Sequence, residues 1–433
     1  MSLTNIESDT TFRDLGLLPA LVNALDAQGI NKPFPIQEAT IPDAIAGHDI
    51  LGRGQTGSGK TLAFGLALLN NIKGVKVKAR QPVALVLAPT RELAQQINEV
   101  LLPLARAVGH DSIVIAGGMP YSKQVNALKR GASILVATPG RLIDLLEKGE
   151  LSLDSLKVTV LDEADQMADM GFFPAVKQIL NQSKRDGQRF LFSATLDRGV
   201  DGLVRQYLRD PKTHTVAEIE GTKSKSDHYV FVLDHSDKAE ISSQIASRDG
   251  KSIFFVRTKR GADRLATRLS SVGVEVGALH GGKSQAVRTR TLARFKAKQS
   301  AVLIATDVAA RGIHVDDIDL VVHFDAPADH KDYLHRSGRT ARAGNSGRVV
   351  TLATREEQRA IGGITIRAGV ETWVMAVKPL DEKLVSITGA RKPSGIPLVE
   401  EKVKVEVSKT SSNRGGQSRN RNRKRQPSRD RRR

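Results

Sequence analysis

The chain has 433 residues, of which 40% are hydrophobic, contains no cysteine, and carries a formal net charge of +19 at pH 7. This length is typical of two or three packed domains, and the absence of cysteine excludes disulfides, thiolate metal ligands and thiol catalysis. No N-terminal segment resembles a signal peptide and no apolar run approaches ~18 residues, which predicts a soluble, cytoplasmic protein.

Short apolar runs alternate with helical patterns along the first half of the chain, an order typical of an α/β fold with a mostly parallel sheet. The expected strands are 83–87, 112–116, 133–136, 158–161 and 190–192. The expected helices include 92–107 and 142–148.

The alternation stops in a polar segment and then restarts, which predicts two similar α/β lobes. Strands of the second half are expected at 229–233, 253–256, 274–278, 302–304, 320–324 and 349–352. We therefore predict a first lobe, a linker, a second lobe and a tail at residues 1–210, 211–227, 228–380 and 381–433.

The positive charge is concentrated at the end of the chain. Residues 408–433 carry eleven Lys and Arg residues against the single acid Asp430, a net charge of +10. This segment is rich in Arg, Asn, Ser, Gln and Gly, which predicts disorder. A polyanionic partner, most simply structured RNA, explains the charge, and a solubilising tail with no specific partner is the alternative.

A phosphate-binding loop is the most specific local pattern. Residues 54–61 read GQTGSGKT, a complete G-x-x-x-x-G-K-[ST] sequence. Its glycines let backbone N–H groups face phosphate oxygens, its lysine reaches the β- and γ-phosphates, and its threonine ligates Mg²⁺. The residues expected to bind nucleotide are Gly57, Ser58, Gly59, Lys60 and Thr61.

An acidic pair follows the expected strand 158–161. Asp162 suits a hard cation such as Mg²⁺, and Glu163 is placed to orient or deprotonate the attacking water. An isolated Asp-Glu pair is usually solvated surface, and an isolated phosphate loop also occurs in proteins without hydrolase activity. The order strand, loop, helix, strand and acidic pair favours a nucleotide hydrolase.

Further strings, read in order, resemble the DEAD-box family of ATP-dependent RNA helicases over roughly residues 10–355. The strings are PFPIQ at 33–37, PTRELA at 89–94, TPGR at 138–141, DEAD at 162–165, SAT at 193–195, ATDVAARG at 305–312 and HRSGRTAR at 335–342. The short basic tail most resembles the bacterial RhlE-like branch. The resemblance implies two tandem RecA-like lobes with a nucleotide cleft between them, and RNA-stimulated ATP hydrolysis coupled to local, non-processive unwinding of short duplexes.

The resemblance also assigns roles around ATP. Gln37 resembles the adenine sensor, and Phe12 stands where an aromatic stacks on the base, although a core position is the alternative. Arg339 and Arg342 resemble the arginine fingers, and their i, i+3 spacing suits one helical face. The remaining implied positions are Asp307 and His335, which couple the RNA and ATP sites, Gly312 near the nucleotide, and Ser193 and Thr195, which couple hydrolysis to strand separation.

RNA contacts implied by the resemblance are small, hydroxylic or basic residues, which suit phosphates and 2′-hydroxyls better than base edges. They are Pro89, Thr90, Arg91, Gly117, Gly118, Thr138, Gly140, Arg141, Thr258, Gln285, Arg288 and Thr306. Because only 4% of residues are aromatic, we expect little base stacking and little sequence preference.

Two other functions remain open at this stage. The first is an RNA chaperone or ATP-gated clamp in which catalysis is secondary, against which stand the intact Lys60, Glu163, Arg339 and Arg342. The second is a DNA helicase of the same two-lobed superfamily, which stimulation of hydrolysis by DNA would reveal.

One departure from the family pattern generates a prediction. His314 stands where relatives commonly have an aspartate that contacts the ATP ribose, and a neutral imidazole still forms hydrogen bonds with a hydroxyl. We expect ATP use to be kept and ribose recognition to be altered. His314→Asp should change the KM for ATP and the discrimination between ATP and dATP in steady-state assays, and unchanged values for both would refute the idea.

Overall fold

The computed structural model describes residues 10–54, 57–196, 198–216, 226–310, 318–341 and 346–398. The expected disordered tail from residue 399 onward lies outside the described residues, and so does the core of the expected linker, 217–225. Within the described ranges, no helix has both the length and the apolar character that crossing a membrane requires.

The first lobe is built on a seven-stranded sheet whose strands are ordered β3-β4-β2-β5-β6-β1-β7. All of its paired strands run parallel. The strands are β1 (Ile50–Arg53), β2 (Ala84–Leu87), β3 (Ser112–Ile115), β4 (Ile134–Ala137), β5 (Val158–Leu161), β6 (Gln188–Ser193) and β7 (Lys212–Thr215).

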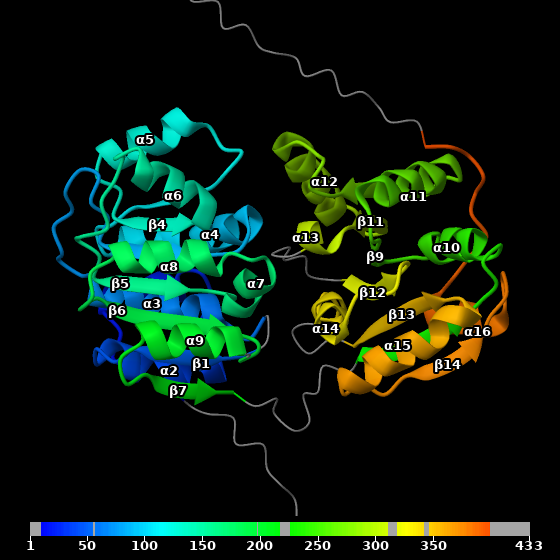
Figure 1. The fold of residues 1–433 in the computed structure, drawn as a ribbon, viewed down its shortest axis with the longest axis horizontal. Helices are drawn as coiled ribbons and strands as arrows, with labels where there is room; N and C mark the ends of the chain where they lie inside the picture. Colours follow the sequence, from blue (N-terminus) through cyan, green and yellow to red (C-terminus); the bar gives the residue numbers. More distant parts are fainter. Residues whose placement is uncertain are drawn as a thin grey trace, which may run out of the picture. The chain divides into compact units, whose positions relative to one another are not determined.

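Helices cover both faces of this sheet because both faces of its central strands are apolar (Figure 1). Along β2, Val86 packs into one core and Leu85 and Leu87 pack into the other. One face is covered by α1 (Pro19–Asp26), α2 (Pro35–Ile45), α3 (Lys60–Asn71) and α4 (Arg91–Ala107). The other is covered by α5 (Tyr121–Lys129), α6 (Pro139–Glu147), α7 (Ala164–Asp169), α8 (Phe173–Gln182) and α9 (Arg198–Tyr207).

The second lobe repeats this plan with a parallel sheet ordered β10-β11-β9-β12-β13-β8-β14. Its strands are β8 (Ser226–Val232), β9 (Lys251–Phe255), β10 (Val276–Leu279), β11 (Ala301–Ala305), β12 (Ile318–His323), β13 (Gly347–Ala353) and β14 (Trp373–Ala376). The two sheets confirm the expected α/β fold of two tandem lobes.

The helices of the second lobe also lie on both faces of the sheet (Figure 1). One face packs against α10 (Lys238–Ala246), α11 (Lys259–Ser271) and α16 (Glu382–Thr388). The remaining helices are α12 (Gln285–Ala297), α13 (Asp307–Ala310), α14 (His330–Ser337) and α15 (Arg355–Arg367).

The structure corrects the expected boundaries at three places. Residues 212–215, expected in the linker, form the edge strand β7 beside β1, and β8 begins at Ser226, inside the expected linker. The expected tail contains α16, whose Leu384 is buried in the second lobe's core. The sequence KTHT of β7 has no apolar alternation because an edge strand buries few side chains, so the hydrophobic pattern did not reveal it.

A buried polar cluster connects β8 to α14 in the second lobe. His228 on β8 makes hydrogen-bond contacts through Nδ1 with the Tyr333 hydroxyl (2.9 Å) and through Nε2 with the Ser226 hydroxyl (2.9 Å). Tyr333 lies on α14 and is fully buried. Burial lowers the pKa of His228 to about 4, an effect that the carboxylate of Asp227 only partly offsets.

This cluster predicts a stability loss in mild acid. Because the folded-state pKa of His228 lies below its ordinary value near 6.5, the unfolded chain binds the proton first as the pH falls. We expect His228 alone to remove on the order of 2–3 kcal/mol of unfolding free energy between about pH 7 and pH 4.5. Fluorescence of the single tryptophan, Trp373, which stacks on Tyr229 in the same lobe, reports the unfolding.

His228→Gln should flatten the pH dependence by that amount, and the exposed His235→Gln should leave it unchanged. Equal pH dependence in both variants would contradict the assignment.

Candidate nucleotide and RNA site

The described part of the phosphate loop joins β1 to α3. Gly59 adopts a φ of +89°, and a side chain there would begin only 2.5 Å from Nε2 of Gln37, so both the backbone and its surroundings require glycine. Lys60 is the first residue of α3 and is buried, and its Nζ donates a hydrogen bond to the Gly54 carbonyl (2.6 Å). Thr61, the next residue of α3, is half-buried.

Gln37 and Phe12, the two residues expected to bind adenine, lie in different surroundings. Gln37 is fully buried, and its Nε2 donates to the Gly59 carbonyl (2.9 Å) while its Oε1 accepts from the Phe34 N–H (2.9 Å). Its amide therefore ties the start of α2 to the phosphate loop and keeps one donor and one lone pair. Phe12 is 2% exposed and packs within the first lobe's core, which favours the alternative of a core position.

The acidic pair sits where β5 ends. Asp162 and Glu163 are both buried, and the Glu163 N–H donates to Oδ1 of Asp162 (3.0 Å). Burial raises the pKa of Asp162 to about 7, with Lys60 opposing the rise and Glu163 adding to it. Glu163 has a φ of +50°, a strained backbone conformation of the kind that concentrates at functional sites.

Asp165 joins the acidic segment to the SAT segment, a role that our sequence reasoning missed. Its Oδ2 accepts from both the N–H and the hydroxyl of Thr195 (2.8 and 2.9 Å), and its own N–H donates to the Ser193 hydroxyl (3.2 Å). The Ser193 hydroxyl in turn donates to the Thr195 carbonyl (2.7 Å). The fourth letter of DEAD was the available signal for this residue.

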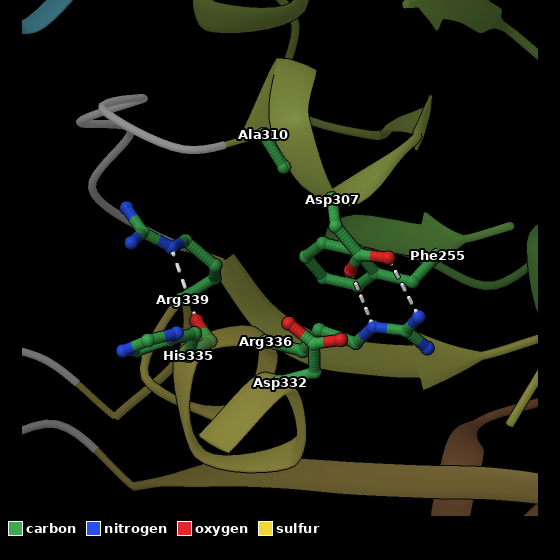
Figure 2. A pocket seen from close by; sticks show the side chains of 7 residues that line it. All are labelled: Phe255, Asp307, Ala310, Asp332, His335, Arg336 and Arg339. Atoms are coloured by element: carbon green, nitrogen blue, oxygen red, sulfur yellow. Dashed lines mark hydrogen bonds and ion pairs between the residues drawn. The ribbon is translucent and has the colours of Figure 1, made fainter. Parts of the chain in front are cut away.

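A small pocket in the second lobe contains three of the expected residues (Figure 2). Asp307 at the start of α13 forms a bidentate ion pair with Arg336, at 2.6 and 2.9 Å. Arg336 is buried, donates to the Asp325 carbonyl (2.7 Å), and lies 5.3 Å from the ring centre of Phe255. Sequence reasoning missed Arg336, although it lies within the HRSGRTAR string.

Arg339 and His335 line the same pocket (Figure 2). The Arg339 Nε donates to the His335 carbonyl (3.3 Å), and the buried Nδ1 of His335 has no hydrogen-bond partner among the described residues. The expected shared helical face for the two arginines is wrong for Arg339, because α14 already ends at Ser337. Arg342, Gly312 and His314 lie outside the described residues.

The backbone of Ala341 adopts a left-handed conformation. Its φ is +55°, and the left-handed conformation costs a non-glycine residue roughly 1–2 kcal/mol. Ala341 therefore stores backbone strain two residues after Arg339.

The expected RNA residues of the first lobe cluster at neighbouring strand ends. Thr90 caps α4 by accepting the Leu93 N–H (3.3 Å), and the Arg91 guanidinium donates to the Gly117 carbonyl (2.8 Å). Burial lowers the pKa of Arg91. Arg141 on α6 is held by Asp144 (3.5 Å) and by the ring of Tyr121 (5.6 Å to its centre). The other members are Pro89, Gly118, Thr138 and Gly140.

The expected RNA residues of the second lobe are all exposed or half-buried. Thr258 caps α11 by accepting the Gly261 N–H (3.0 Å) and is exposed. Gln285 and Arg288 on α12 both contact the buried Glu92, at 3.2 Å each. Thr306 accepts the N–H groups of two residues of α13 through its carbonyl.

The acidic pair fits a divalent cation. Among the described residues, the buried Oε2 of Glu163 has no hydrogen-bond partner, and the buried Asp162 carries an unfavourable negative charge, as its raised pKa shows. A hard cation relieves both costs. The described residues contain no group of three or more His, Cys, Asp or Glu side chains suited to a metal, so Asp162 and Thr61 would hold Mg²⁺ together with nucleotide phosphates.

Comparison with known proteins identifies two family models along the chain. Residues 34–203 match the DEAD/DEAH box helicase model, and residues 237–344 match the helicase conserved C-terminal domain. The chain is 40% identical over 364 residues to DEAD-box ATP-dependent RNA helicase 9, mitochondrial, of Arabidopsis thaliana, covering 82% of this chain and 59% of that protein. It is 42% identical over 349 residues to ATP-dependent rRNA helicase RRP3 of Pyricularia oryzae, covering 79% and 64%.

Solved structures agree with these relatives. The fold matches S. cerevisiae Dbp5 bound to RNA and ADP BeF3 with a TM-score of 0.76 and 30% identity, covering 88% of this chain and 99% of that one. It also matches Mss116p bound to ssRNA and AMP-PNP, with a TM-score of 0.75 and 25% identity, covering 88% and 82%. The chain spans about three fifths of the curated relatives' length. Those relatives are plant and fungal, which gives no support to the expected RhlE-like branch.

Gly140 supplies a prediction for the strand ends of the first lobe. A Cβ added to this exposed glycine in α6 would meet no protein atom within 4 Å, so packing does not require glycine there. Gly140→Ala should leave stability unchanged or raise it by at most about 1 kcal/mol. We expect RNA affinity to fall by about tenfold, or ~1.4 kcal/mol, because the methyl group occupies space that the RNA backbone needs.

The matched control is Gly362→Ala on α15, where an added Cβ likewise meets nothing. Fluorescence anisotropy with labelled RNA measures both variants, and equal affinities would remove Gly140 from the RNA site.

Proposed function

Because this chain belongs to the DEAD-box helicase family, we propose that it is an RNA-stimulated ATPase that locally unwinds or remodels short RNA duplexes. The observation that carries this proposal is the bridge formed by Asp165. Its carboxylate accepts two hydrogen bonds from Thr195, so the acidic segment that serves ATP is joined directly to the segment after β6. A change at one strand end is thereby transmitted to the next.

On the nucleotide side, the phosphate loop holds the triphosphate with backbone N–H groups and Lys60. Glu163 accepts the proton of the attacking water through its carboxylate, whose Oε2 has no hydrogen-bond partner in the part of the chain that the structure describes. When bound at Asp162 and Thr61, Mg²⁺ neutralises charge on the phosphate oxygens. Arg339 and Arg342 supply further positive charge from the second lobe, and guanidinium groups suit phosphate oxygens through paired donors.

On the RNA side, the strand is held by its sugar–phosphate backbone. Arg91 holds the loop that contains Gly117 through a hydrogen bond to the Gly117 carbonyl. Gly140, the second residue of α6, adds no side chain to the surface of the first turn. Binding that favours a bent single strand over a duplex shifts the equilibrium towards strand separation. This energetic preference acts over a few base pairs and does not require movement along the strand.

The second lobe contributes through the pocket that contains Asp307, His335 and Arg339. Asp307 follows β11 and is held by Arg336, which lies between His335 and Arg339 at the end of α14 and in the turn after it. This arrangement supports Asp307 and His335 as residues that connect the RNA-binding and ATP-binding states. The joint action of two lobes, a first that ends after β7 and a second that runs from β8 to α16, is part of the same proposal.

We also propose a branch of the family, a cellular location and an RNA partner for the tail. The short basic tail favours the RhlE-like branch, and a cytoplasmic location follows only from our sequence analysis. Structured RNA is the proposed partner of the tail, with counterion release as the source of affinity.

The decisive test is steady-state ATP hydrolysis with single-stranded RNA, duplex RNA or DNA. We expect RNA to stimulate turnover, and Glu163→Gln to lower the stimulated rate at least ~100-fold because the general base is lost. Glu99→Gln, at an exposed position of α4 in the same lobe, is the matched control and should retain activity.

Binding of RNA without stimulated, Glu163-dependent turnover would identify a clamp or annealing chaperone instead. Equal stimulation by DNA and RNA would favour a DNA helicase of the same superfamily.

A further inference from the structure

Helix α11 presents a row of arginines to solvent. Arg260, Arg264 and Arg268 are all exposed, and their four-residue spacing places them along one side of the helix. Each step of four residues advances about 6 Å. The opposite side of α11 is buried in the core through Ala262, Leu265 and Leu269, so the helix is rigidly held while the arginines face outward. We call these three residues the arginine row.

No carboxylate neutralises the arginine row among the described residues. The nearest acid in sequence, Asp263, is already paired with Lys283 (2.8 Å) and contacts His280 (3.0 Å). Some other arginines of the lobe, in contrast, have acidic partners, such as Arg248 with Asp319 and Arg294 with Glu275. The row therefore retains three positive charges on one side of a fixed helix.

The row begins at the proposed RNA site. Thr258 caps the N-terminus of α11, and the side chain of Lys259 lies against the Gly281–Gly282 turn. That turn leads directly into α12, which carries Gln285 and Arg288. The first turn of α11 thus adjoins both second-lobe segments that are proposed to bind the RNA strand.

The row ends where the described chain ends. The Leu398 N–H donates to the carbonyl of Ser270 (3.1 Å), the penultimate residue of α11, and the Ser270 hydroxyl donates to the Leu398 carbonyl (3.4 Å). The chain continues from residue 399 by covalent continuity, and the basic segment 408–433 begins ten residues after Leu398. The described chain therefore ends beside Ser270, two residues beyond Arg268 and at the far end of the row from Thr258.

We propose that the arginine row binds the phosphate backbone of an RNA stem that flanks the single strand held at Thr258 and α12. Guanidinium groups stay charged and bind phosphate oxygens through paired donors. A row fixed on a rigid helix suits the regular backbone of an A-form stem, which proteins recognise by shape and phosphates. The inference rests on the proposed function. It extends the RNA contacts from Thr258 and α12 along α11 to the end of the described chain.

The test is RNA binding by the full chain carrying Arg260→Gln, Arg264→Gln and Arg268→Gln together. Fluorescence anisotropy is measured against salt concentration with two probes, a short unstructured single strand and the same strand flanked by a stem. The matched control replaces three exposed arginines on α15, a helix of the same length in the same lobe, namely Arg355→Gln, Arg359→Gln and Arg367→Gln. Both triple variants change the net charge equally.

We expect the row variant to bind the stem-flanked probe about tenfold more weakly at about 50 mM salt, with a salt slope smaller by about 2. Its affinity for the short strand and its Trp373 fluorescence should match those of the unsubstituted protein and the control, which shows intact folding. Removing residues 408–433 from the row variant should weaken stem binding further.

An unchanged affinity for the stem-flanked probe, an equal loss for both probes, or an equal loss in the control would overturn the inference. This readout is binding alone and is independent of ATP turnover. Absence of RNA-stimulated hydrolysis in the unsubstituted protein would therefore refute the proposed function separately.

Discussion

All paired strands in both sheets run parallel, and this constraint determines where the chemistry lies. Parallel strands share one polarity, so their carboxyl ends meet along a single edge, where open α/β sheets bind ligands. Helices cover both faces, which leaves that edge as the place where backbone groups meet a ligand. The segments that follow β1, β2, β4, β5 and β6 are the phosphate loop, PTRELA, TPGR, DEAD and SAT.

The buried carboxylates at this edge differ in whether other protein groups already bind them. Asp165 accepts two hydrogen bonds from Thr195 and is fully used by the fold. Glu163 has one carboxylate oxygen without a partner among the described residues, and the pKa of the neighbouring Asp162 is raised by burial. Burying an uncompensated charge is costly. A bound cation or a transferred proton would stabilise the carboxylates of Asp162 and Glu163.

The second lobe applies the same fold to a different task. Its pocket is organised by the buried pair of Asp307 and Arg336 rather than by a phosphate loop, and its polar cluster at His228 and Tyr333 holds the helix that precedes Arg339. The arginine row on α11 places further positive charge between Thr258 and the end of the described chain at Leu398. In the proposed function, phosphate recognition is therefore distributed over rigid helices, which suits binding that depends little on base sequence.

The sequence by itself determined the alternation of two α/β lobes, the phosphate loop at Lys60 and the acidic pair at Asp162 and Glu163, because hydrophobic period and motif spacing are local properties. It missed the edge strands β7 and β14, whose exposed side chains carry no burial pattern. Only the tertiary structure revealed that Phe12 is a core residue, that Asp165 binds Thr195, and that Arg336 holds Asp307. Those roles depend on contacts between segments far apart in the chain, which no local pattern records.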